Sequence, residues 1–506
     1  MSKNFYALLA ERFHPHADAV ALETPGGVHY SFAGLDREAA RYASLYRALG
    51  LAPGDRVAMQ IDKSPQALFA YLGCLRAGLI YLPLNTAYRD LEIAYFLENA
   101  EPKLVVCSPA QRDTVVRLAA ERAVAHVHTL DAEGRGSLAD AAAMQPDAFD
   151  TVSVNENDVA VILYTSGTTG KPKGAMITHA NLASNGFALQ KSWGFSSSDV
   201  LLHALPIFHI HGLFVAAHVA LLSACKMIFL PKFDTATVMA MLPRATVFMG
   251  VPTYYTRLLA EPAFGKEHCR GMRLFTCGSA PLLAQTFHEF EQRSGHAILE
   301  RYGMTETGMN TSNPLHGQRR PGTVGPALPG VAIRIADDKD REVAAGEVGQ
   351  LLVKGGNVFK GYWRMPVKTA EEFTADGFFR TGDLARMDAG GYVAIVGRAK
   401  DLIISGGFNI YPKEIEGYID KLDGVLESAV IGVPHPDFGE AVIAVIVQKT
   451  GAAELNEATV IAALKSQIAG FKVPKRVFFV VELPRNTMGK VQKNVLREMY
   501  VKNIAW

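Results

Sequence analysis

One eleven-residue segment, YTSGTTGKPKG at residues 164–174, constrains what this chain can fold into more than any other part of it. Its three glycines allow the backbone to adopt positive φ and to bring N–H groups close to anionic oxygens. Its hydroxyls and two lysines add hydrogen-bond donors and positive charge. The apolar residues 159–164 (VAVILY) are typical of a buried strand. A strand followed by such a segment predicts a polyphosphate site, and a flexible surface loop is the alternative.

The spacing of the segment differs from that of the Walker A loop. That pattern has four residues between its first glycine and Gly-Lys-Ser/Thr, and a helix follows it. Here only two residues separate Gly167 from Gly170, and Pro172 follows Lys171 at the position where Ser or Thr would hold Mg²⁺. The segment therefore indicates a nucleotide-binding protein outside the Walker class.

Composition and charge exclude several classes of function. A chain of 506 residues is too long for one core, so we expect two to four domains. The share of hydrophobic residues is 49% and that of charged residues 20%, as in ordinary globular enzymes. The formal net charge is only +1, so the chain lacks the excess of positive charge that attracts nucleic acid or an anionic membrane. Neither is therefore an expected partner.

The cysteines and the apolar segments indicate a cytoplasmic protein. Five cysteines lie scattered without a CxxC spacing, which predicts neither disulfides nor zinc and favours a reducing compartment. The N-terminal residues carry charges where a secretory signal needs an apolar run. Residues 213–230 are long and apolar, but His218, Ser223 and Lys226 interrupt them. We expect a buried helix running into a strand there, and no membrane insertion.

The order of predicted elements indicates an α/β fold. Strands alternate with helices over the first 300 residues, as at 56–62 (RVAMQID) and 65–78 (PQALFAYLGCLRAG), which predicts parallel sheets with crossover helices. From about Gly322 the segments become short and β-rich. After Arg398 a smaller α+β unit follows, with strands such as SAVIGVP and AVIAVIVQK and helices from Pro412 and near residues 458–469.

Three further motifs carry groups suited to nucleotide chemistry. In ERYGMTETG, Glu306 beside Thr305 is a candidate Mg²⁺ ligand, and a capped helix start is the alternative. In FRTGDLARMD, Asp383 could accept hydrogen bonds from a ribose diol, and an ordinary turn aspartate is the alternative. In PRNTMGKVQK, Lys490 follows a glycine, and an exposed surface lysine is the default explanation.

Together with GRAKDLIISGG at residues 397–407, these motifs resemble the adenylate-forming acyl-CoA synthetase superfamily, which includes luciferases and peptide-synthetase adenylation domains. The resemblance covers nearly the whole chain. It implies an N-terminal domain over residues 1–398, with parallel-rich sheets flanked by helices and a distorted β-barrel subdomain. It also implies a small, mobile α+β C-terminal domain over residues 399–506, with a hinge at Lys400.

The resemblance further implies substrates and site residues. ATP and a carboxylate would form an acyl-adenylate on Mg²⁺, and CoA would then displace AMP. It places catalysis on Lys490, Glu306, Thr305 and His209, with Glu306 as the Mg²⁺ ligand, and CoA contacts at Ser405, Gly406 and Gly407. The implied ATP or AMP contacts are Thr165, Ser166, Gly167, Thr168, Thr169, Gly170, Lys171, Lys173, Gly278, Ala280, Pro281, Tyr302, Gly303, Asp383 and Arg398.

The acyl substrate is indicated by basic and polar residues near the expected pocket. Arg301 directly precedes Tyr302, Arg257 lies in VPTYYTRLL, and Ser279 lies in TCGSAPL. An arginine buried at an acyl site predicts a second anion in the substrate, because burial without a partner is costly and the guanidinium binds carboxylates bidentately. The segment resembles that of malonyl-CoA synthetases, which implies malonate and also methylmalonate as substrates. The alternative is that Arg301 turns outward and pairs with Glu300 or a surface acid.

Several other possibilities stay open at this point. Other candidate acids are oxalate, another small acid, and an aryl or medium-chain acid, and an adenylation enzyme that loads a carrier protein in trans is a further alternative. His209 and His211 in PIFHIHG could ligate a metal, but no Asp, Glu or Cys lies at ligand spacing, so His209 is expected to line the acyl pocket. Lys490 lies in a polar segment, and a lysine acetyltransferase or deacetylase acting on it is an expected partner.

Overall fold

The structure, a computed structural model, describes residues 3–165, 172–405, 408–452, 455–486, 489–501 and 504. The chain forms two compact units. The first comprises Met1–Ala332 with Val353–Phe379, and the second comprises Ile333–Leu352 with Arg380–Trp506. The domain boundary predicted after Arg398 falls inside the second unit and stays a prediction.

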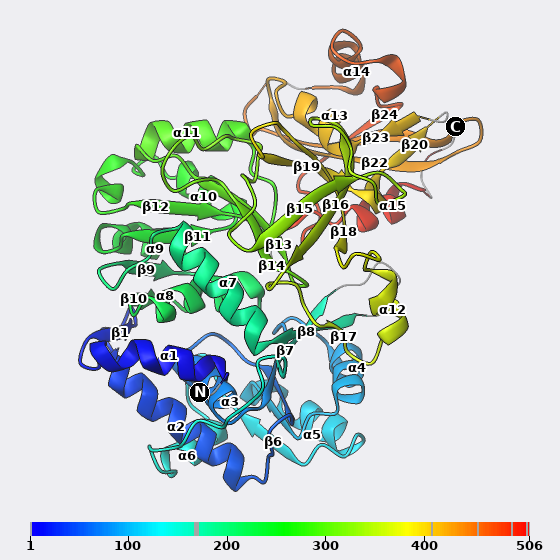
Figure 1. Cartoon of the computed structure of the whole chain (residues 1–506). Coiled ribbons are helices and arrows are strands. Elements are labelled where there is room, and N and C mark those ends of the chain that lie inside the picture. The colour runs from blue at the N-terminus through cyan, green and yellow to red at the C-terminus, as the bar shows by residue number, and fades with distance from the viewer. Residues whose placement is uncertain are drawn as a thin grey trace. The chain divides into compact units, whose positions relative to one another are not determined.

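The first unit contains two large sheets, as the alternation of strands and helices predicts (Figure 1). Both are mainly parallel, with antiparallel strands at one or both edges. The seven-stranded sheet has the order β17 (Gly361–Tyr362), β8 (Lys173–Thr178), β7 (Val159–Thr165), β4 (Ile80–Pro83), β3 (Arg56–Gln60), β5 (Leu104–Cys107), β6 (His126–Thr129). The eight-stranded sheet has the order β14 (Gly308–Ser312), β13 (Leu299–Met304), β12 (Leu274–Cys277), β11 (Val247–Gly250), β9 (Val200–His203), β10 (Lys226–Phe229), β1 (Val20–Glu23), β2 (His29–Ser31).

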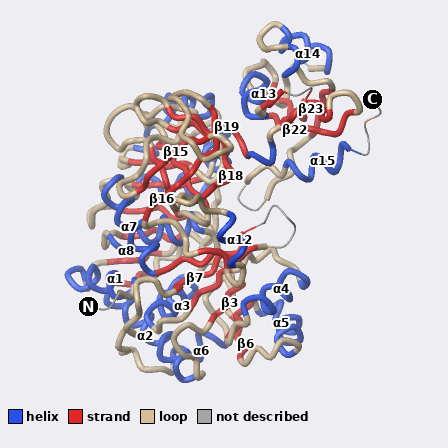
Figure 2. The backbone as a smooth tube through the Cα atoms, turned by 45° about the vertical axis from the view of Figure 1, so that its right-hand side comes forward, coloured by secondary structure: helices blue, strands red, loops and turns tan. Residues whose placement is uncertain are grey.

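Helices flank the strands of this unit, and some of them pack against one another between its two sheets (Figures 1 and 2). In α3, a serine N-cap and a proline in the first turn start the helix, and nine consecutive residues of it are buried. The helices are α1 (Phe5–Phe13), α2 (Phe32–Ala48), α3 (Pro65–Arg76), α4 (Asp90–Ala100), α5 (Arg112–Ala120), α6 (Ser137–Ala143), α7 (His179–Ser192), α8 (His218–Leu222), α9 (Thr235–Met241), α10 (Pro252–Ala260), α11 (Ala284–Ser294) and α12 (Pro366–Glu371), with a π-helix, η3 (His211–Ala217), before α8.

The apolar run at residues 213–230 is a buried helical segment that leads into strand β10, as predicted. It begins in η3 and continues through α8. His218, one of the polar interruptions, is fully buried and its Nε2 lies 2.8 Å from the Tyr71 hydroxyl. Among the described residues, every helix is too short or too polar to span a bilayer.

The strand predicted before the phosphate segment is β7, and β8 follows that segment. The two strands pair antiparallel, with Thr165 opposite Lys173. A segment between antiparallel strands differs from the strand–loop–helix arrangement of a Walker A site. Residues 166–171 themselves lie outside the described part of the chain.

The β-rich region after Gly322 forms a four-stranded sheet, and the chain beyond Arg398 forms an α+β fold with a five-stranded sheet. Helix α13, predicted from Pro412, and the helix predicted near residues 458–469, which is α14, pack with this second sheet around an aliphatic core. The elements are β15 (Val331–Ala336), β16 (Val348–Gly355), β18 (Phe379–Met387), β19 (Val393–Arg398), β20 (Ile403–Ser405), β21 (Phe408–Ile410), α13 (Pro412–Ile419), β22 (Val425–His435), β23 (Gly439–Gln448), α14 (Glu457–Lys465), β24 (Arg476–Val480) and α15 (Lys493–Val501).

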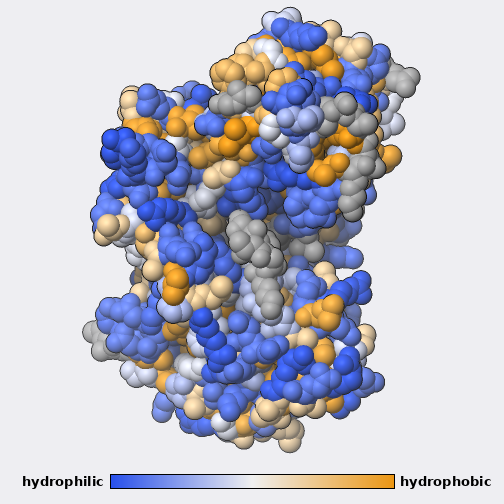
Figure 3. Space-filling view, turned by 90° about the vertical axis from the view of Figure 1, so that its right-hand side faces the viewer, coloured by the Kyte–Doolittle hydropathy of each residue, from blue (hydrophilic) through white to orange (hydrophobic). Residues whose placement is uncertain are grey.

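The surface and the cysteines agree with the composition. On the face drawn in Figure 3, hydrophilic residues predominate and hydrophobic ones are interspersed among them. All five cysteines are free thiols and buried, so their packing is that of small apolar residues.

Candidate active site

Arg301 lies in strand β13, where the sheet alternation turns it away from its neighbour Glu300. Only 3% of its surface is exposed. Its Nε and Nη2 are buried and have no hydrogen-bond partner among the described residues. The alternative of an outward-facing arginine paired with Glu300 is therefore wrong, and Glu300 Oε1 instead accepts the Gly322 N–H at 3.1 Å.

The unpaired guanidinium is held in a tight, mostly uncharged site. Burial lowers the pKa of Arg301 to about 10, which still leaves it charged at neutral pH. A Cβ at position 278 would lie 2.3 Å from Arg301 Nη1, so a side chain there would displace the guanidinium from its place. Gly278 was predicted to contact the nucleotide, and its structural role here is to make room for the guanidinium. A charged donor buried without an acceptor costs several kcal/mol, and a bound anion would relieve that cost.

Ser279 and His211 lie next to this arginine. Ser279 follows β12 and has a φ of 70°, a strained value for a residue with a side chain. Its Oγ lies 3.2 Å from His211 Nδ1, at the start of η3. The Nε2 of His211 is buried without a partner among the described residues. Burial, with Arg301 second, lowers the pKa of His211 well below its usual range, so the ring is neutral.

Two other residues predicted for this pocket are placed differently. His209 is half-buried, and its Nδ1 accepts the His211 N–H at 3.2 Å, so the fully buried histidine beside Ser279 is His211. Arg257 is exposed on α10. Cys277 and, after it, Tyr255 on the same helix as Arg257 raise the pKa of Arg301 against the effect of burial. The assignment of Arg257 to the acyl substrate stays a prediction.

Glu306 lies in the turn between β13 and β14, so the alternative of a helix start is wrong. Tyr302 and Gly303 belong to β13 itself, and the turn is made by the residues from Thr305 to Thr307. Gly303 is required because a Cβ there would lie 2.1 Å from the Gly308 carbonyl oxygen.

The Glu306 carboxylate is buried and joins segments from both large sheets. The Tyr362 hydroxyl donates to its Oε1 at 3.0 Å, and the Thr165 hydroxyl donates to the same oxygen at 3.5 Å. The structure thus brings together the end of β7, where the phosphate segment begins, and the predicted metal ligand. A buried carboxylate fits the oxygen ligands that Mg²⁺ prefers.

Lys173, at the start of β8, is buried, and its ammonium group contacts other side chains of the protein. Its Nζ lies 3.6 Å from Glu372 Oε1 and 4.2 Å from the centre of the Tyr362 ring. Lys173 therefore supports the tyrosine that holds Glu306, and phosphate contact by Lys173 stays a prediction. Ser166, Gly167, Thr168, Thr169, Gly170 and Lys171 lie outside the described residues. Ala280 and Pro281 follow Ser279, half-buried and exposed respectively.

The second unit gathers the remaining predicted groups. Asp383 and Arg398 face each other across β18 and β19, and Arg398 Nε lies 2.7 Å from Asp383 Oδ1. Lys490 lies near both. Loss of water around the amine lowers its pKa, Arg398 and Lys400 lower it further, and Asp383 and Asp401 oppose them. Asp383 and Lys490, more than 100 positions apart in sequence, thus lie in one charged cluster, although the Lys490 side chain is itself exposed, as the alternative predicted.

The residues predicted to face CoA follow this cluster in the chain. Ser405 ends β20 and is 6% exposed, while Gly406 and Gly407 lie outside the described residues. Their contact with CoA stays a prediction, as does the hinge at Lys400.

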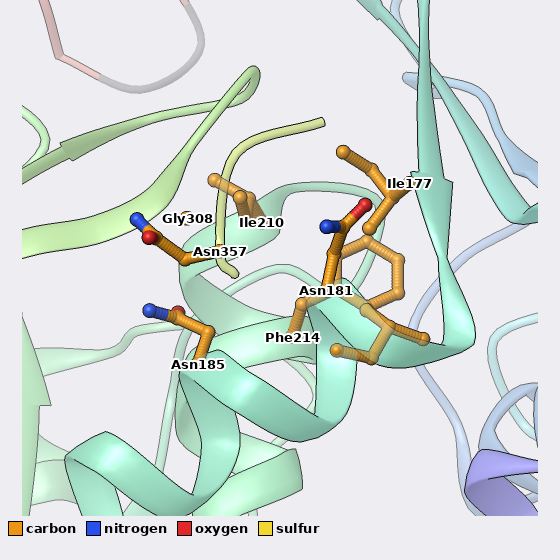
Figure 4. A pocket seen from close by; sticks show the side chains of 8 residues that line it. Ile177, Asn181, Asn185, Ile210, Phe214, Gly308 and Asn357 are labelled. Atoms are coloured by element: carbon orange, nitrogen blue, oxygen red, sulfur yellow. The ribbon is translucent and has the colours of Figure 1, made fainter. Parts of the chain in front are cut away.

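A small cavity of about 20 Å³ lies between η3, α7 and the start of β14. Figure 4 shows the amides of Asn181, Asn185 and Asn357 around it. Its volume suits one water molecule, so it is too small for an acyl group. Its amides fix the surrounding backbone instead: Asn185 bonds Met309 and Asn357 bonds the Thr307 carbonyl.

Sequence reasoning missed two side chains of the site. His211 was named only as a candidate metal ligand, although its position before the glycine of HIHG could have marked it. Tyr362 lies in KGYW, and no spacing in the sequence connects it with Glu306. Among the described residues, no three His, Cys, Asp or Glu side chains form a metal-binding group.

The chain is similar to known proteins over nearly its whole length. Residues 9–363 match the AMP-binding enzyme family, and residues 414–490 match the AMP-binding enzyme C-terminal domain. A crystal structure of ATP-bound MatB from Rhodopseudomonas palustris is 56% identical, has a TM-score of 0.97, and covers 99% of both chains. A malonate–CoA ligase from Arabidopsis thaliana is 34% identical over 528 residues, which cover 95% of this chain and 86% of the relative. A feruloyl-CoA synthase from an Amycolatopsis species is 36% identical over 493 residues, with 97% of each chain covered.

The two relatives act on different acids at similar identity, so identity alone does not select the substrate. The family match, in contrast, spans most of the chain and includes the segments that carry Thr165, Glu306 and Lys490. The chain belongs to the AMP-binding enzyme family.

Proposed function

We propose that this protein is an ATP-dependent ligase that joins malonate, and also methylmalonate, to CoA with release of AMP and pyrophosphate. One carboxylate of the acid attacks the α-phosphate of ATP and releases pyrophosphate. The CoA thiol then attacks the acyl carbon, loses its proton and displaces AMP. The first step converts the carboxylate, whose oxygen is a poor leaving group, into a mixed carboxylic–phosphoric anhydride from which AMP departs readily.

The observation that carries the choice of acid is that the buried Nε and Nη2 of Arg301 have no hydrogen-bond partner in the described part of the chain. The second carboxylate of malonate would accept from its Nε and Nη2, which form a planar pair of donors. Ser279 and the neutral His211 use one of their two polar hydrogens in their mutual hydrogen bond, so the pair can donate one further hydrogen bond, from Ser279 Oγ or from His211 Nε2. A monocarboxylic or aryl acid would leave the guanidinium buried without an acceptor, so this site disfavours such acids.

We assign three charged side chains roles in the first step. Lys490 places a cation at the charge that develops when two anions react. Asp383 accepts hydrogen bonds from the ribose hydroxyls. Glu306 would hold Mg²⁺, which when bound offsets the negative charge of the phosphates. Tyr362 and Thr165 orient the Glu306 carboxylate through its Oε1.

We also propose the cytoplasm as the place of action, since five buried free thiols suit a reducing compartment. Lys490 is proposed as the target of a lysine acetyltransferase and deacetylase. Its lowered pKa increases the share of neutral amine, the form that attacks an acyl donor.

An exchange assay tests the choice of acid. ATP–pyrophosphate exchange is measured with malonate, methylmalonate, oxalate, acetate and coumarate, with and without CoA. Malonate and methylmalonate should give the highest kcat/KM, because only an acid with a correctly spaced second carboxylate satisfies Arg301. Equal exchange with acetate or coumarate would contradict a dicarboxylate site, and transfer to a carrier protein in preference to CoA would favour a loading enzyme.

Replacement of Arg301 separates recognition from stability. Arg301→Met should raise the malonate KM by roughly 10- to 100-fold, since a charge-assisted hydrogen bond contributes about 1.5–3 kcal/mol, while the KM for ATP stays nearly constant. The melting temperature should not fall, because an unpaired buried charge is removed. Arg270→Ala, which removes an exposed arginine paired with Glu267, is the matched control and should change neither constant. An unchanged malonate KM in Arg301→Met would refute the assignment.

Tyr362→Phe tests the support of Glu306. The variant keeps the ring under Lys173 but loses the hydroxyl that donates to Glu306, so the Mg²⁺ concentration for half-maximal exchange should rise roughly tenfold. Tyr164→Phe removes a hydroxyl that bonds Asn99 instead and serves as the control. Calorimetry of Mg²⁺–ATP binding supplies a second measurement, and equal Mg²⁺ dependence in both variants would contradict the role of Tyr362.

The pH dependence of exchange tests Lys490. The lysine must be protonated to offset negative charge, and its pKa is lowered, so exchange should decline with rising pH below the usual lysine value of about 10.4. Lys490→Arg carries a cation that does not titrate in this range and should lose this decline, whatever its absolute rate. Acetylation of Lys490 should abolish exchange. Full exchange by the acetylated protein would disprove both the catalytic and the regulatory role.

A further inference from the structure

A lysine and a histidine that belong to none of the predicted motifs form a buried pair in the first unit. Lys63 lies in the loop between β3 and α3, and His203 ends strand β9. Lys63 is 6% exposed and His203 is 1% exposed. The Nζ of Lys63 lies 2.7 Å from His203 Nδ1 and 2.7 Å from the His203 carbonyl oxygen.

Among the described residues, no carboxylate pairs with this amine. The amine also lies over the Phe229 ring, whose centre is 4.2 Å from Nζ. Burial lowers the pKa of Lys63 well below its usual value. A lysine buried without an acid is costly, and an apolar side chain of similar size would fill the space, so packing alone does not account for it.

The contacts of His203 determine which of its nitrogens carries hydrogen. Its Nε2 lies 2.8 Å from the Gly212 carbonyl oxygen, and a carbonyl oxygen can only accept, so Nε2 is the donor. Burial, with Lys63 second, lowers the pKa of His203, so its ring is neutral and Nδ1 is an acceptor. Lys63 therefore donates to Nδ1 and fixes both the tautomer and the orientation of the ring.

The Gly212 carbonyl belongs to the turn that carries His209 and His211. The N–H groups of Gly212 and Leu213 both bond to the His209 carbonyl, at 3.2 and 3.1 Å. On the other side of the turn, a Cβ at position 212 would lie 2.0 Å from the Pro206 carbonyl oxygen. Pro206 thus limits the turn sterically, and His203 fixes it by a hydrogen bond.

We propose that Lys63 is a positioning residue for the acyl site. It orients His203, His203 holds the Gly212 carbonyl, and this contact sets the place of the adjacent His211 beside Ser279 and Arg301. The inference rests on the proposed function of the Arg301 site. Lys63 itself touches neither substrate nor any group assigned to catalysis, and it acts on acid recognition through the turn alone.

The test compares the KM for malonate and the KM for ATP of the Lys63→Met variant with those of the unchanged protein. Loss of one hydrogen bond to a positioning group should raise the malonate KM roughly tenfold, while the KM for ATP stays within about twofold. A merely structural lysine would instead lower the melting temperature and change both constants together. Lys226→Met is the matched control, since Lys226 lies in the neighbouring strand β10 but pairs with Glu23 and should leave the malonate KM unchanged.

Variants of His203 test whether Lys63 acts through His203 and the Gly212 carbonyl. His203→Phe should reproduce the effect of Lys63→Met, and the double variant should be no worse than either single one, because both remove the same contact. His203→Gln can still donate to Gly212 and accept from Lys63, so it should retain most of the malonate affinity. These variants also keep the test informative if Lys63→Met does not fold.

The outcomes distinguish this inference from the proposed function. Unchanged malonate KM in Lys63→Met, or losses that add in the double variant, would overturn the positioning role. If Arg301→Met also leaves the malonate KM unchanged, the acyl site itself is wrongly placed. If Arg301→Met raises it while Lys63→Met does not, only the role of Lys63 fails.

Discussion

The guanidinium of Arg301 is the constraint on which the first unit's candidate site depends, because its buried Nε and Nη2 have no acceptor among the residues that the structure describes. Removing a charge from water costs several kcal/mol unless a partner compensates. The surrounding backbone is shaped around the guanidinium. Gly278 has no side chain and so leaves room for it, and the next residue, Ser279, has a strained φ of 70°. Strain and unmet donors in one place are typical of a site completed by its ligand.

This site is assembled at one edge of the eight-stranded sheet. β9 ends at His203 and β12 ends at Cys277, next to Gly278, while β13 supplies Arg301. In an open parallel sheet the carboxyl ends of neighbouring strands meet, and ligand sites form there. The π-helix η3 begins at the same edge with His211. A π-helical turn is rare and often marks a functional site, because its extra residue per turn displaces side chains from regular α-helical positions.

Buried polar pairs connect this edge to the seven-stranded sheet. Glu306, in the turn after β13, accepts from Thr165 at the end of β7. Lys63, in the loop after β3, donates to His203 at the end of β9. Hydrogen bonds are directional, so these two pairs fix orientation more closely than apolar packing does. The polar pairs therefore determine how the site is arranged, and the large apolar cores on either side give it a rigid support.

The sequence by itself determined the fold class, most element positions and the chemistry of the nucleotide motifs. Periodicity located β7, α3 and α13 because local patterns of apolar residues, glycines and prolines decide where elements begin and end. Only the tertiary structure decided which side chains meet. Burial of Arg301, the Tyr362–Glu306 hydrogen bond, the Lys63–His203 pair and the nearness of Lys490 to Asp383 all join residues distant in the chain. Such contacts depend on strand order and crossover connections, which local sequence patterns do not encode.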